Sequence, residues 1–354
     1  LIKSWLAAGH EVIAAAPEEE VAEQLAAWLV PFERIPLNRT GMNPIKDLIL
    51  LYHIRKIVKL HKPTYLFLYT VKPVIYGSLA TWGNTGCRCY SMITGLGYVF
   101  TEASGSSRLL RYIVEQLYRM ALKRNERIFF QNPDDYALFV RKNLVSKKKS
   151  LLINGSGINL DYYQIADLPE KKYIFLMIAR LLIEKGVREY IQAAGLVKQK
   201  YPEAQFILVG WAFSDNQSSI SETDVERWKN EGVVDILSEL EDVRPIIASS
   251  SVYVLPSYRE GTPRTVLEAM AMGRPIITSD APGCRETVED GVNGFLVPVR
   301  DVDSLAEAME RFIREPELLA KLGAESRRIA EEKYDVHKVN KAINRAMGLK
   351  YVIA

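Results

Sequence analysis

Short apolar runs that alternate with helical patterns constrain the fold of this chain most strongly. The clearest runs lie at 173–179, 205–209 and 252–255, and apolar residues at helical spacing fill the intervals between them. Strands that are apolar without alternation are buried on both faces, as in a parallel sheet covered by helices. The second half of the chain therefore predicts an α/β domain with a parallel sheet.

The first half shows the same alternation, with helices predicted at 44–60, 107–125 and 133–142 and strands between them. A chain of 354 residues has enough length for two domains. Two such domains side by side leave a cleft for a ligand at the carboxyl ends of their strands. We assign residues 1–165 to a first Rossmann-like domain, 166–333 to a second, and 334–354 to a helix that crosses back to the first.

The start of the chain is unusual for this fold. It opens at Leu1 within a helical pattern that runs to Gly9, and a strand is predicted only at 12–16. Parallel α/β domains rarely begin with a helix. We therefore expect that a first strand and the loop after it are missing from the N-terminal domain of this chain.

Composition excludes several classes of protein. With 48% apolar and 25% charged residues, the chain is typical of a soluble globular protein rather than a disordered or fibrous one. Its three cysteines, Cys87, Cys89 and Cys284, offer neither a disulfide framework nor a zinc site and indicate a reducing compartment. The most apolar stretch, 65–82, contains a Lys-Pro pair and does not predict a membrane span.

Charge is distributed unevenly along the chain. Residues 1–165 carry 21 Lys and Arg against 13 Asp and Glu, a net charge of +8, whereas the remainder carries −5. Such a basic half is suited to an anionic surface, either lipid head groups or a phosphorylated acceptor. An ordinary solvated face is the simpler alternative.

A loop with two cations follows the strand predicted at 173–179. It places Arg180 and Lys185 five residues apart, directly before Gly186 and a helical pattern. Cationic side chains beside the free amides of a helix N-terminus make a site for a phosphate or diphosphate. Because cations at loop borders are usually just solvated, this loop alone leaves both interpretations open.

Two carboxylates follow the strand predicted at 252–255. Glu260 lies in a glycine-containing loop, Pro263 occupies the first position of a predicted helix, and Glu268 lies roughly two turns into that helix. This arrangement suits a ligand with hydroxyl groups at both ends and phosphate in the middle, such as a sugar nucleotide. The simpler alternatives are a helix-start anion for Glu260 and a helix-surface charge for Glu268.

Several spaced motifs agree with one known family. In chain order they are Arg180 to Gly186, Val254 to Pro263, Leu267 to Pro275, Gly283 to Glu286 and Asp290 to Pro298. Together they resemble retaining glycosyltransferase family four, whose E-x7-E signature is met by Glu260 and Glu268. The resemblance covers nearly the whole chain and implies the GT-B fold, in which two Rossmann-like domains face a cleft.

The resemblance implies a donor site in the second domain. The donor-binding residues would be Arg180, Lys185, Glu260, Gly261, Thr262, Pro263 and Glu268. Arg180 and Lys185 would hold the diphosphate and stabilise the leaving group, and Glu260 would meet the hydroxyl groups of the transferred sugar. Glu268 would accept hydrogen bonds from the ribose. These three groups, Arg180, Lys185 and Glu260, are the implied catalytic residues.

The first half resembles a narrower group, the bacterial enzymes that extend oligosaccharides linked to polyprenyl diphosphate. The matching segments are Arg39 to Pro44, Lys72 to Gly77 and Thr94 to Phe100. The implied acceptor-side residues are Gly95, Gly97, Arg39 and Lys72. The glycines would let the backbone approach the reacting sugar, and the cations would meet acceptor phosphates unless they are ordinary surface charges.

The sequence and the resemblance imply no metal and no cofactor apart from the UDP-sugar donor. Asp301-Val302-Asp303 has the D-x-D form that binds metal in the other glycosyltransferase fold. Because it opens a predicted helix at 304–313, helix capping is the favoured interpretation. Many relatives carry a histidine in the loop at 94–97, and since this chain has none there, no catalytic histidine is assigned.

The predicted function is transfer of a hexosyl or N-acetylhexosaminyl unit from a UDP-sugar to a polyprenyl-diphosphate-linked saccharide, with retention of configuration. We expect a cytoplasmic enzyme in peripheral contact with the anionic inner face of the cell membrane. Its partners would be the nucleotide-sugar donor and the lipid-linked acceptor, with no nucleic acid. The alternatives are a UDP-N-acetylhexosamine epimerase of the same fold and a non-catalytic protein that binds sugar nucleotides.

Overall fold

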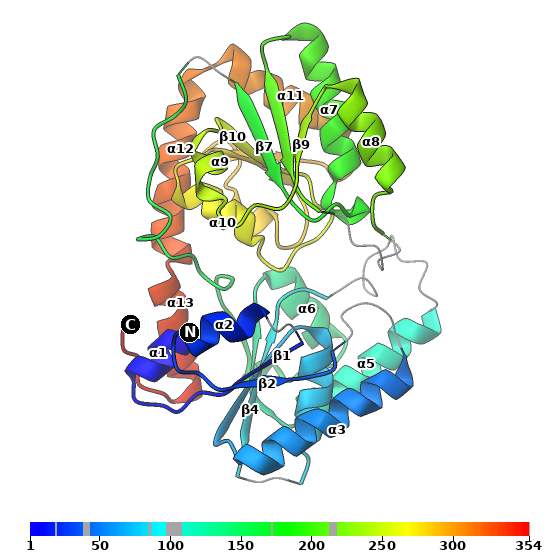
Figure 1. Cartoon of the computed structure of the whole chain (residues 1–354), viewed down its shortest axis with the longest axis vertical. Helices are drawn as coiled ribbons and strands as arrows, with labels where there is room; N and C mark the ends of the chain where they lie inside the picture. Colours follow the sequence, from blue (N-terminus) through cyan, green and yellow to red (C-terminus); the bar gives the residue numbers. More distant parts are fainter. Residues whose placement is uncertain are drawn as a thin grey trace. The chain divides into compact units, whose positions relative to one another are not determined.

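The computed structural model describes residues 1–17, 20–37, 43–83, 86–96, 108–170, 173–211 and 218–353 (Figure 1), with only the backbone of Glu20. The chain divides into two compact units. Unit 1 comprises Leu1–Ile153 and Val339–Ala354, and unit 2 comprises Asn154–Lys338. Within the described residues, every strand pair of both units is parallel. The α/β fold with parallel sheets that the sequence predicts is therefore confirmed.

Unit 2 is built on a six-stranded sheet in the order β12-β11-β10-β7-β8-β9. The strands are β7 (Ile174–Ile178), β8 (Gln205–Val209), β9 (Asp235–Leu237), β10 (Val252–Leu255), β11 (Ile276–Ser279) and β12 (Gly294–Val297). The helices are η4 (Ile183–Lys185), α7 (Val187–Lys200), α8 (Glu222–Glu231), α9 (Arg244–Ala248), α10 (Arg264–Ala271), η5 (Arg285–Thr287), α11 (Val302–Arg314), α12 (Glu317–Ile329) and η6 (Ala330–Tyr334).

The strand order of unit 2 fixes where a ligand can bind. From β7 the chain proceeds outward to β8 and β9, and from the neighbouring β10 it proceeds the other way to β11 and β12. In open parallel sheets the crevice lies where the order reverses, beyond the carboxyl ends of the strands. The loops after β7 and β10 occupy that switch point.

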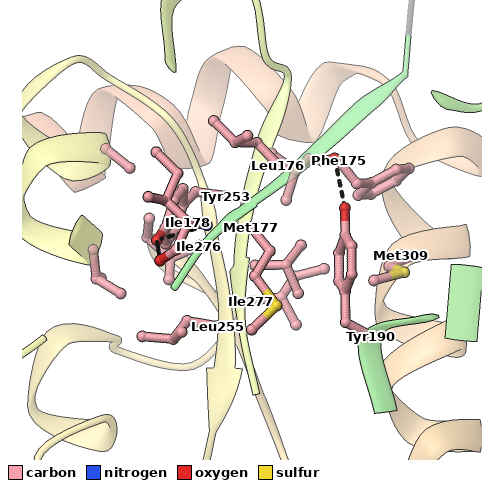
Figure 2. Packing of buried hydrophobic residues seen from close by; sticks show 14 of the residues in the cluster. Phe175, Leu176, Met177, Ile178, Tyr190, Tyr253, Leu255, Ile276, Ile277 and Met309 are labelled. Atoms are coloured by element: carbon pink, nitrogen blue, oxygen red, sulfur yellow. Dashed lines mark hydrogen bonds between the residues drawn. The ribbon is translucent and has the colours of Figure 1, made fainter. Parts of the chain in front are cut away.

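The core of unit 2 explains why its strands are apolar on both faces. Phe175 of β7 stacks on Phe206 of β8, with ring centroids 5.2 Å apart. The Tyr190 hydroxyl of α7 is buried and donates to the carbonyl of Phe175 at 2.7 Å (Figure 2). On the other side of β7, the Tyr253 hydroxyl donates to the carbonyl of Ile178 at 3.0 Å. Both hydroxyls are thus satisfied inside an otherwise apolar core.

Unit 1 holds a two-stranded and a four-stranded sheet. The first pairs β1 (Ala14–Ala16) with β2 (Phe32–Arg34), and the second has the order β3 (Tyr65–Tyr69), β4 (Arg88–Ile93), β5 (Asn125–Phe130) and β6 (Ser150–Leu152). Its helices are α1 (Ile2–Ala7), α2 (Glu20–Ala26), α3 (Pro44–His61), η1 (Pro73–Gly77), α4 (Ser78–Ala80), α5 (Arg108–Leu122), α6 (Pro133–Arg141), η3 (Lys147–Lys149) and most of α13 (Val336–Met347).

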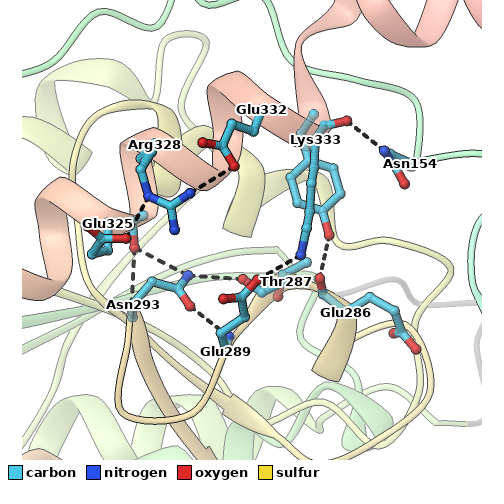
Figure 3. Close-up of polar contacts among 11 residues, drawn as sticks. Asn154, Glu286, Thr287, Glu289, Asn293, Glu325, Arg328, Glu332 and Lys333 are labelled. Carbon is cyan, nitrogen blue, oxygen red and sulfur yellow. Dashed lines mark hydrogen bonds and ion pairs between the residues drawn. The ribbon is translucent and has the colours of Figure 1, made fainter.

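The segment after β6 belongs to unit 2 by its contacts. The amide of Ile158 donates to the carbonyl of Tyr334 at 2.7 Å, and the amide of Val336 donates back to Ile158 at 3.0 Å. Asn154 donates to the carbonyl of Lys333 at 2.9 Å (Figure 3). These bonds place the boundary after Ile153, whereas the sequence pattern predicts it after residue 165.

The end of the chain packs on unit 1. Val339, Ile343 and Met347 of α13 join a core cluster with residues of β4 and β5. The indole nitrogen of Trp5 donates to the Oδ1 atom of Asn344 at 3.0 Å. The second boundary accordingly follows Lys338, five residues later than the one drawn from the sequence, because α13 begins in unit 2 and only its later turns contact unit 1.

Candidate functional site

The loops after β7 and β10 are held together by backbone contacts. Gly186 adopts a φ of +75°, and a Cβ atom added there would lie 2.1 Å from the carbonyl oxygen of Pro256. The carbonyl of Glu184 accepts from the amide of Tyr258 at 2.9 Å and from the hydroxyl of Ser257 at 3.0 Å. Only glycine permits this approach, so the loop with two cations and the loop with Glu260 form one rigid surface.

A third loop fixes the backbone at Glu260. The amide of Glu260 donates to the carbonyl of Pro282 at 2.9 Å. A Cβ atom on Gly283, which has a φ of +81°, would lie 2.1 Å from the carbonyl oxygen of Glu260. The predicted motif from Gly283 to Glu286 therefore has a structural role here, since it holds the carboxylate loop at the switch point.

Lys185 and Glu260 form an ion pair between Nζ and Oε1. Their side chains are only 15% and 14% exposed. In such a sheltered position a charge-assisted hydrogen bond is stronger than at an open surface. The structure thus brings together two of the predicted site residues, and in it the two side-chain charges neutralise each other.

Glu268 lies on α10 and is buried, with 8% of its side chain exposed. Its Oε1 atom accepts from the Tyr163 hydroxyl at 2.9 Å and from Nε of Arg264 at 3.0 Å. Burial, together with the charge of Glu268, raises the pKa of Tyr163. Glu268 is therefore no ordinary helix-surface charge, because two donors fix its carboxylate in a sheltered position.

Two details of α10 differ from the expectation. Pro263 is the N-cap, with an extended backbone (ψ 113°), and the helix begins at Arg264. The carbonyl of Pro263 still accepts from the amide of Leu267 at 3.3 Å, as an N-cap carbonyl does. Glu268 therefore lies about one turn into the helix rather than two.

Arg180, Gly261 and Thr262 belong to the same two loops. Arg180 directly precedes Leu181 and Leu182, which are buried and anchor the loop, whereas Arg180 itself is exposed. A Cβ atom on Gly155 would lie 2.9 Å from the Cβ atom of Thr262, so the turn that opens unit 2 packs against the carboxylate loop. The predicted donor residues all lie in the two loops at the switch point or in the first part of α10.

The structure describes only two of the four predicted acceptor-side residues. Arg39 and Gly97 lie outside the described residues. Gly95 follows β4 with a φ of 134°, a conformation that favours glycine. Lys72 forms an ion pair with Asp47 of α3 at 2.8 Å, and a phosphate at this position would share Lys72 with that carboxylate.

Tyr163 and Arg264 also belong to the site, although no motif in the sequence predicts them. The spacing of Arg264 and Glu268, four residues apart on a helix, is a detectable signal for a side-chain pair. No comparable signal exists for Tyr163, which is 105 residues from Glu268 in the chain. Only the fold brings it there, because the hydroxyl of Tyr163, in the segment that opens unit 2, reaches Glu268 of α10.

The D-x-D sequence acts as a helix cap. Asp301 precedes α11, and its side chain accepts from the amide of Ser304 at 2.9 Å and from its hydroxyl at 2.7 Å. These hydrogen bonds lower the pKa of Asp301. The capping interpretation is confirmed.

Two family models match the chain. The family described as Glycosyl transferases group 1 matches residues 161–329, and the family described as Glycosyl transferase 4-like matches residues 1–132. The first match contains both loops of the switch point and α10.

Similar proteins carry related names. The chain is 28% identical to the N,N'-diacetylbacillosaminyl-diphospho-undecaprenol alpha-1,3-N-acetylgalactosaminyltransferase of Campylobacter jejuni, over 90% of this chain and 86% of that protein. It is 26% identical to the UDP-Gal:alpha-D-GlcNAc-diphosphoundecaprenol alpha-1,3-galactosyltransferase of Escherichia coli, over 78% of this chain and 73% of that protein.

The fold also has solved counterparts. The structure of Anabaena HepE in complex with UDP-glucose matches 95% of this chain and 91% of that one, with a TM-score of 0.76 at 20% identity. At this identity the likeness shows the fold alone. The solved structure thus shows the GT-B fold, and the two family models, which together match residues 1–132 and 161–329, show that the chain belongs to the glycosyltransferases.

Proposed function

We propose that the protein transfers a hexosyl or N-acetylhexosaminyl unit from a UDP-sugar to a saccharide linked to polyprenyl diphosphate, with retention of anomeric configuration. The main support is the Lys185–Glu260 ion pair at the switch point of the unit 2 sheet. It provides one cation for a diphosphate and one carboxylate for sugar hydroxyls within the same small region. The acceptor class follows the names of the Campylobacter and Escherichia relatives.

In the proposed donor complex the ion pair exchanges partners. The diphosphate takes the ammonium of Lys185, and Arg180 from the same loop adds a second cation. Glu260, released from Lys185, accepts hydrogen bonds from the hydroxyl groups of the transferred sugar. Negative charge develops on the diphosphate as the anomeric C–O bond breaks, and positioned cations stabilise it as donors stabilise an oxyanion.

The remaining donor contacts lie along α10. Glu268 accepts hydrogen bonds from the ribose hydroxyls, and the amides near Gly261 and Thr262 face the phosphate and sugar. In this proposal Tyr163 and Arg264 do not touch the donor but keep the Glu268 carboxylate in position. The cations supply the charge that neutralises the leaving group, so no essential metal is required.

The proposed acceptor is linked to a lipid, so the enzyme must reach a membrane to use it. Among the described residues, no helix has both the length and the apolarity needed to cross a bilayer. We therefore propose peripheral contact with the inner face of the cell membrane, where the basic first half meets anionic lipids. Gly95, and Lys72 if it separates from Asp47, would contact the acceptor.

A panel of UDP- and GDP-sugars, tested for protection against thermal unfolding, identifies the donor first. The selected donor is then incubated with a short-chain prenyl-diphosphate N-acetylhexosamine, and products are resolved by mass spectrometry. We expect a UDP-sugar to raise the unfolding temperature and the acceptor to gain one sugar. Isomerised UDP-N-acetylhexosamine formed without acceptor would instead indicate an epimerase, and binding without any product would indicate a non-catalytic protein.

A further inference from the structure

Helix α3 is apolar on two opposite faces. Its inner face buries Leu50, Ile54 and Val58 in a core cluster of unit 1. A surface helix normally has one apolar stripe, and polar side chains occupy the opposite face. The outer face of α3 departs from this rule.

Four large apolar side chains follow one another along the outer face of α3. Ile45, Leu48, Ile49 and Tyr52 stand at positions i, i+3, i+4 and i+7, and their exposed fractions range from 43% to 70%. Single exposed apolar residues are common on proteins, but a contiguous stripe usually marks an interaction surface. The first half of α3 therefore has an apolar outer face whose side chains are largely exposed.

Cations occupy the second half of the same helix. Arg55, Lys56 and Lys59 are exposed, and none of them has an ion pair with another described residue. The sole acid of the helix, Asp47, lies on the inner face and is paired with Lys72. Within the part of the chain that the structure describes, the outer face of α3 thus combines apolar side chains with positive charge that no ion pair neutralises.

Helix α5 adds a similar face nearby. Leu109, Tyr112 and Ile113 are exposed at positions i, i+3 and i+4, and the exposed Arg108 precedes them. Both α3 and α5 contact η1 and α4, so the two helices are neighbours within unit 1 (Figure 1). We call their outer faces together the α3–α5 surface.

We propose that the α3–α5 surface docks on an anionic lipid bilayer, with its apolar side chains at the acyl boundary and its cations among the lipid phosphates. The inference rests on the proposed function, because a polyprenyl-linked acceptor lies in a bilayer. The charge pattern argues against the other occupants. A symmetric contact between two copies would bring like cations together, and a nucleic acid would leave the apolar stripe uncovered.

Vesicle co-sedimentation of the full chain tests this proposal. One set of vesicles contains phosphatidylcholine alone, and the other contains phosphatidylcholine with phosphatidylglycerol. We expect binding to the anionic vesicles, weaker binding at high salt, and little binding to phosphatidylcholine. Equal binding to both sets, or none to either, would overturn the proposal.

Charge variants locate the surface. Lys56→Gln/Lys59→Gln should weaken binding to anionic vesicles about 30-fold, since it removes two charges near the lipid. The control is Lys229→Gln/Lys321→Gln, which removes two exposed lysines from unit 2 and changes the net charge equally. Equal losses in the two variants would show that net charge alone acts, and would contradict a docking surface on α3.

Apolar variants test the insertion. Leu48→Asn/Tyr52→Asn should weaken binding by about tenfold or more, whereas Ile353→Asn, at an equally exposed apolar position outside both helices, should not. All of these side chains are exposed, and unchanged unfolding temperatures confirm that the variants fold. Unchanged vesicle binding by Leu48→Asn/Tyr52→Asn would overturn the assignment of α3 as a lipid-docking surface. A wild-type dimer, seen by sedimentation, that dissociates in this variant would overturn it as well.

Transfer to a water-soluble, short-chain acceptor separates this proposal from the proposed function. The α3 variants should retain that transfer while losing activity on vesicle-embedded acceptor. Transfer to both acceptors without vesicle binding would contradict docking and leave the enzymatic proposal intact. Specific binding through α3 without transfer to either acceptor would support docking and contradict the enzymatic proposal.

Discussion

The ammonium of Lys185 and the carboxylate of Glu260, 75 residues apart in the chain, form an ion pair where the order of the unit 2 sheet reverses. Gly186 and Gly283 permit the backbone approaches that hold these two loops together. The pair therefore stands on a rigid surface. In the proposed reaction it is the resting state of a site that exchanges this contact for a diphosphate and a sugar.

Lys185→Ala should lower kcat by about a hundredfold or more, because the leaving diphosphate loses a positioned cation. Steady-state kinetics at saturating donor measures this effect. Lys200→Ala removes a largely exposed lysine from the end of α7 and should leave kcat unchanged. Normal turnover in Lys185→Ala would exclude Lys185 from leaving-group stabilisation.

Tyr163→Phe should raise the KM for the donor by up to about tenfold with little change in kcat, because Glu268 loses one of the hydrogen bonds that position it. Glu268→Gln should act in the same direction and more strongly. The adjacent Tyr162→Phe is the matched control, since Tyr162 contacts Arg244 through its ring. Identical donor KM values for Tyr163→Phe and Tyr162→Phe would show that Tyr163 does not position the carboxylate.

Much of the fold could be predicted because burial leaves a signal in the sequence. Strands β8 and β10 have the bounds that their apolar runs predict. In contrast, the sequence predicts no strand at β2, which has only three residues, two of them charged, or at β11, which ends in Thr278 and Ser279. In the structure these strands pair with β1 and with β10.

The site was predictable where it lies in local motifs. Residues on strand-to-helix loops, such as Lys185 and Glu260, stand out because the loops follow clear strands. The burial of Glu268 and its contact with Tyr163 depend on a distant segment, for which one sequence has no periodic signal. The unit boundary after Ile153 has no local signal either, since long-range bonds to Tyr334 and Lys333 set it.

The protein should lose stability in alkali. Burial raises the pKa of Tyr190 and Tyr253 above the ordinary value of 10. The folded state therefore keeps these protons where the unfolded state has released them, and the free energy of unfolding falls as pH rises above 10. The part of the tyrosinate absorbance that comes from the buried tyrosines should appear only together with loss of circular dichroism. Ionisation of all tyrosines near pH 10 in the folded protein would contradict the burial of these hydroxyls.

Chelation should leave transfer unchanged, because cations from the chain neutralise the leaving group and Asp301 is engaged in capping α11. Assays before and after dialysis against EDTA measure this, with added magnesium as the reference. Asp301→Ala should cost about 1 kcal/mol of stability through loss of the cap, without a change in kcat. Activity that disappears with EDTA and returns with magnesium would show a metal requirement.

Titration calorimetry measures directly which ligand groups Lys185 and Glu260 bind. UDP and the UDP-sugar are each titrated into the wild type, Lys185→Ala and Glu260→Gln. If Lys185 binds the diphosphate and Glu260 binds the sugar, Lys185→Ala should weaken the binding of both ligands. Glu260→Gln frees Lys185, so it should bind UDP at least as tightly as the wild type while losing the added affinity for the sugar. Two results would contradict these roles of Lys185 and Glu260. One is an equal loss of affinity for UDP and for the UDP-sugar in Glu260→Gln, and the other is unchanged affinity for both ligands in Lys185→Ala.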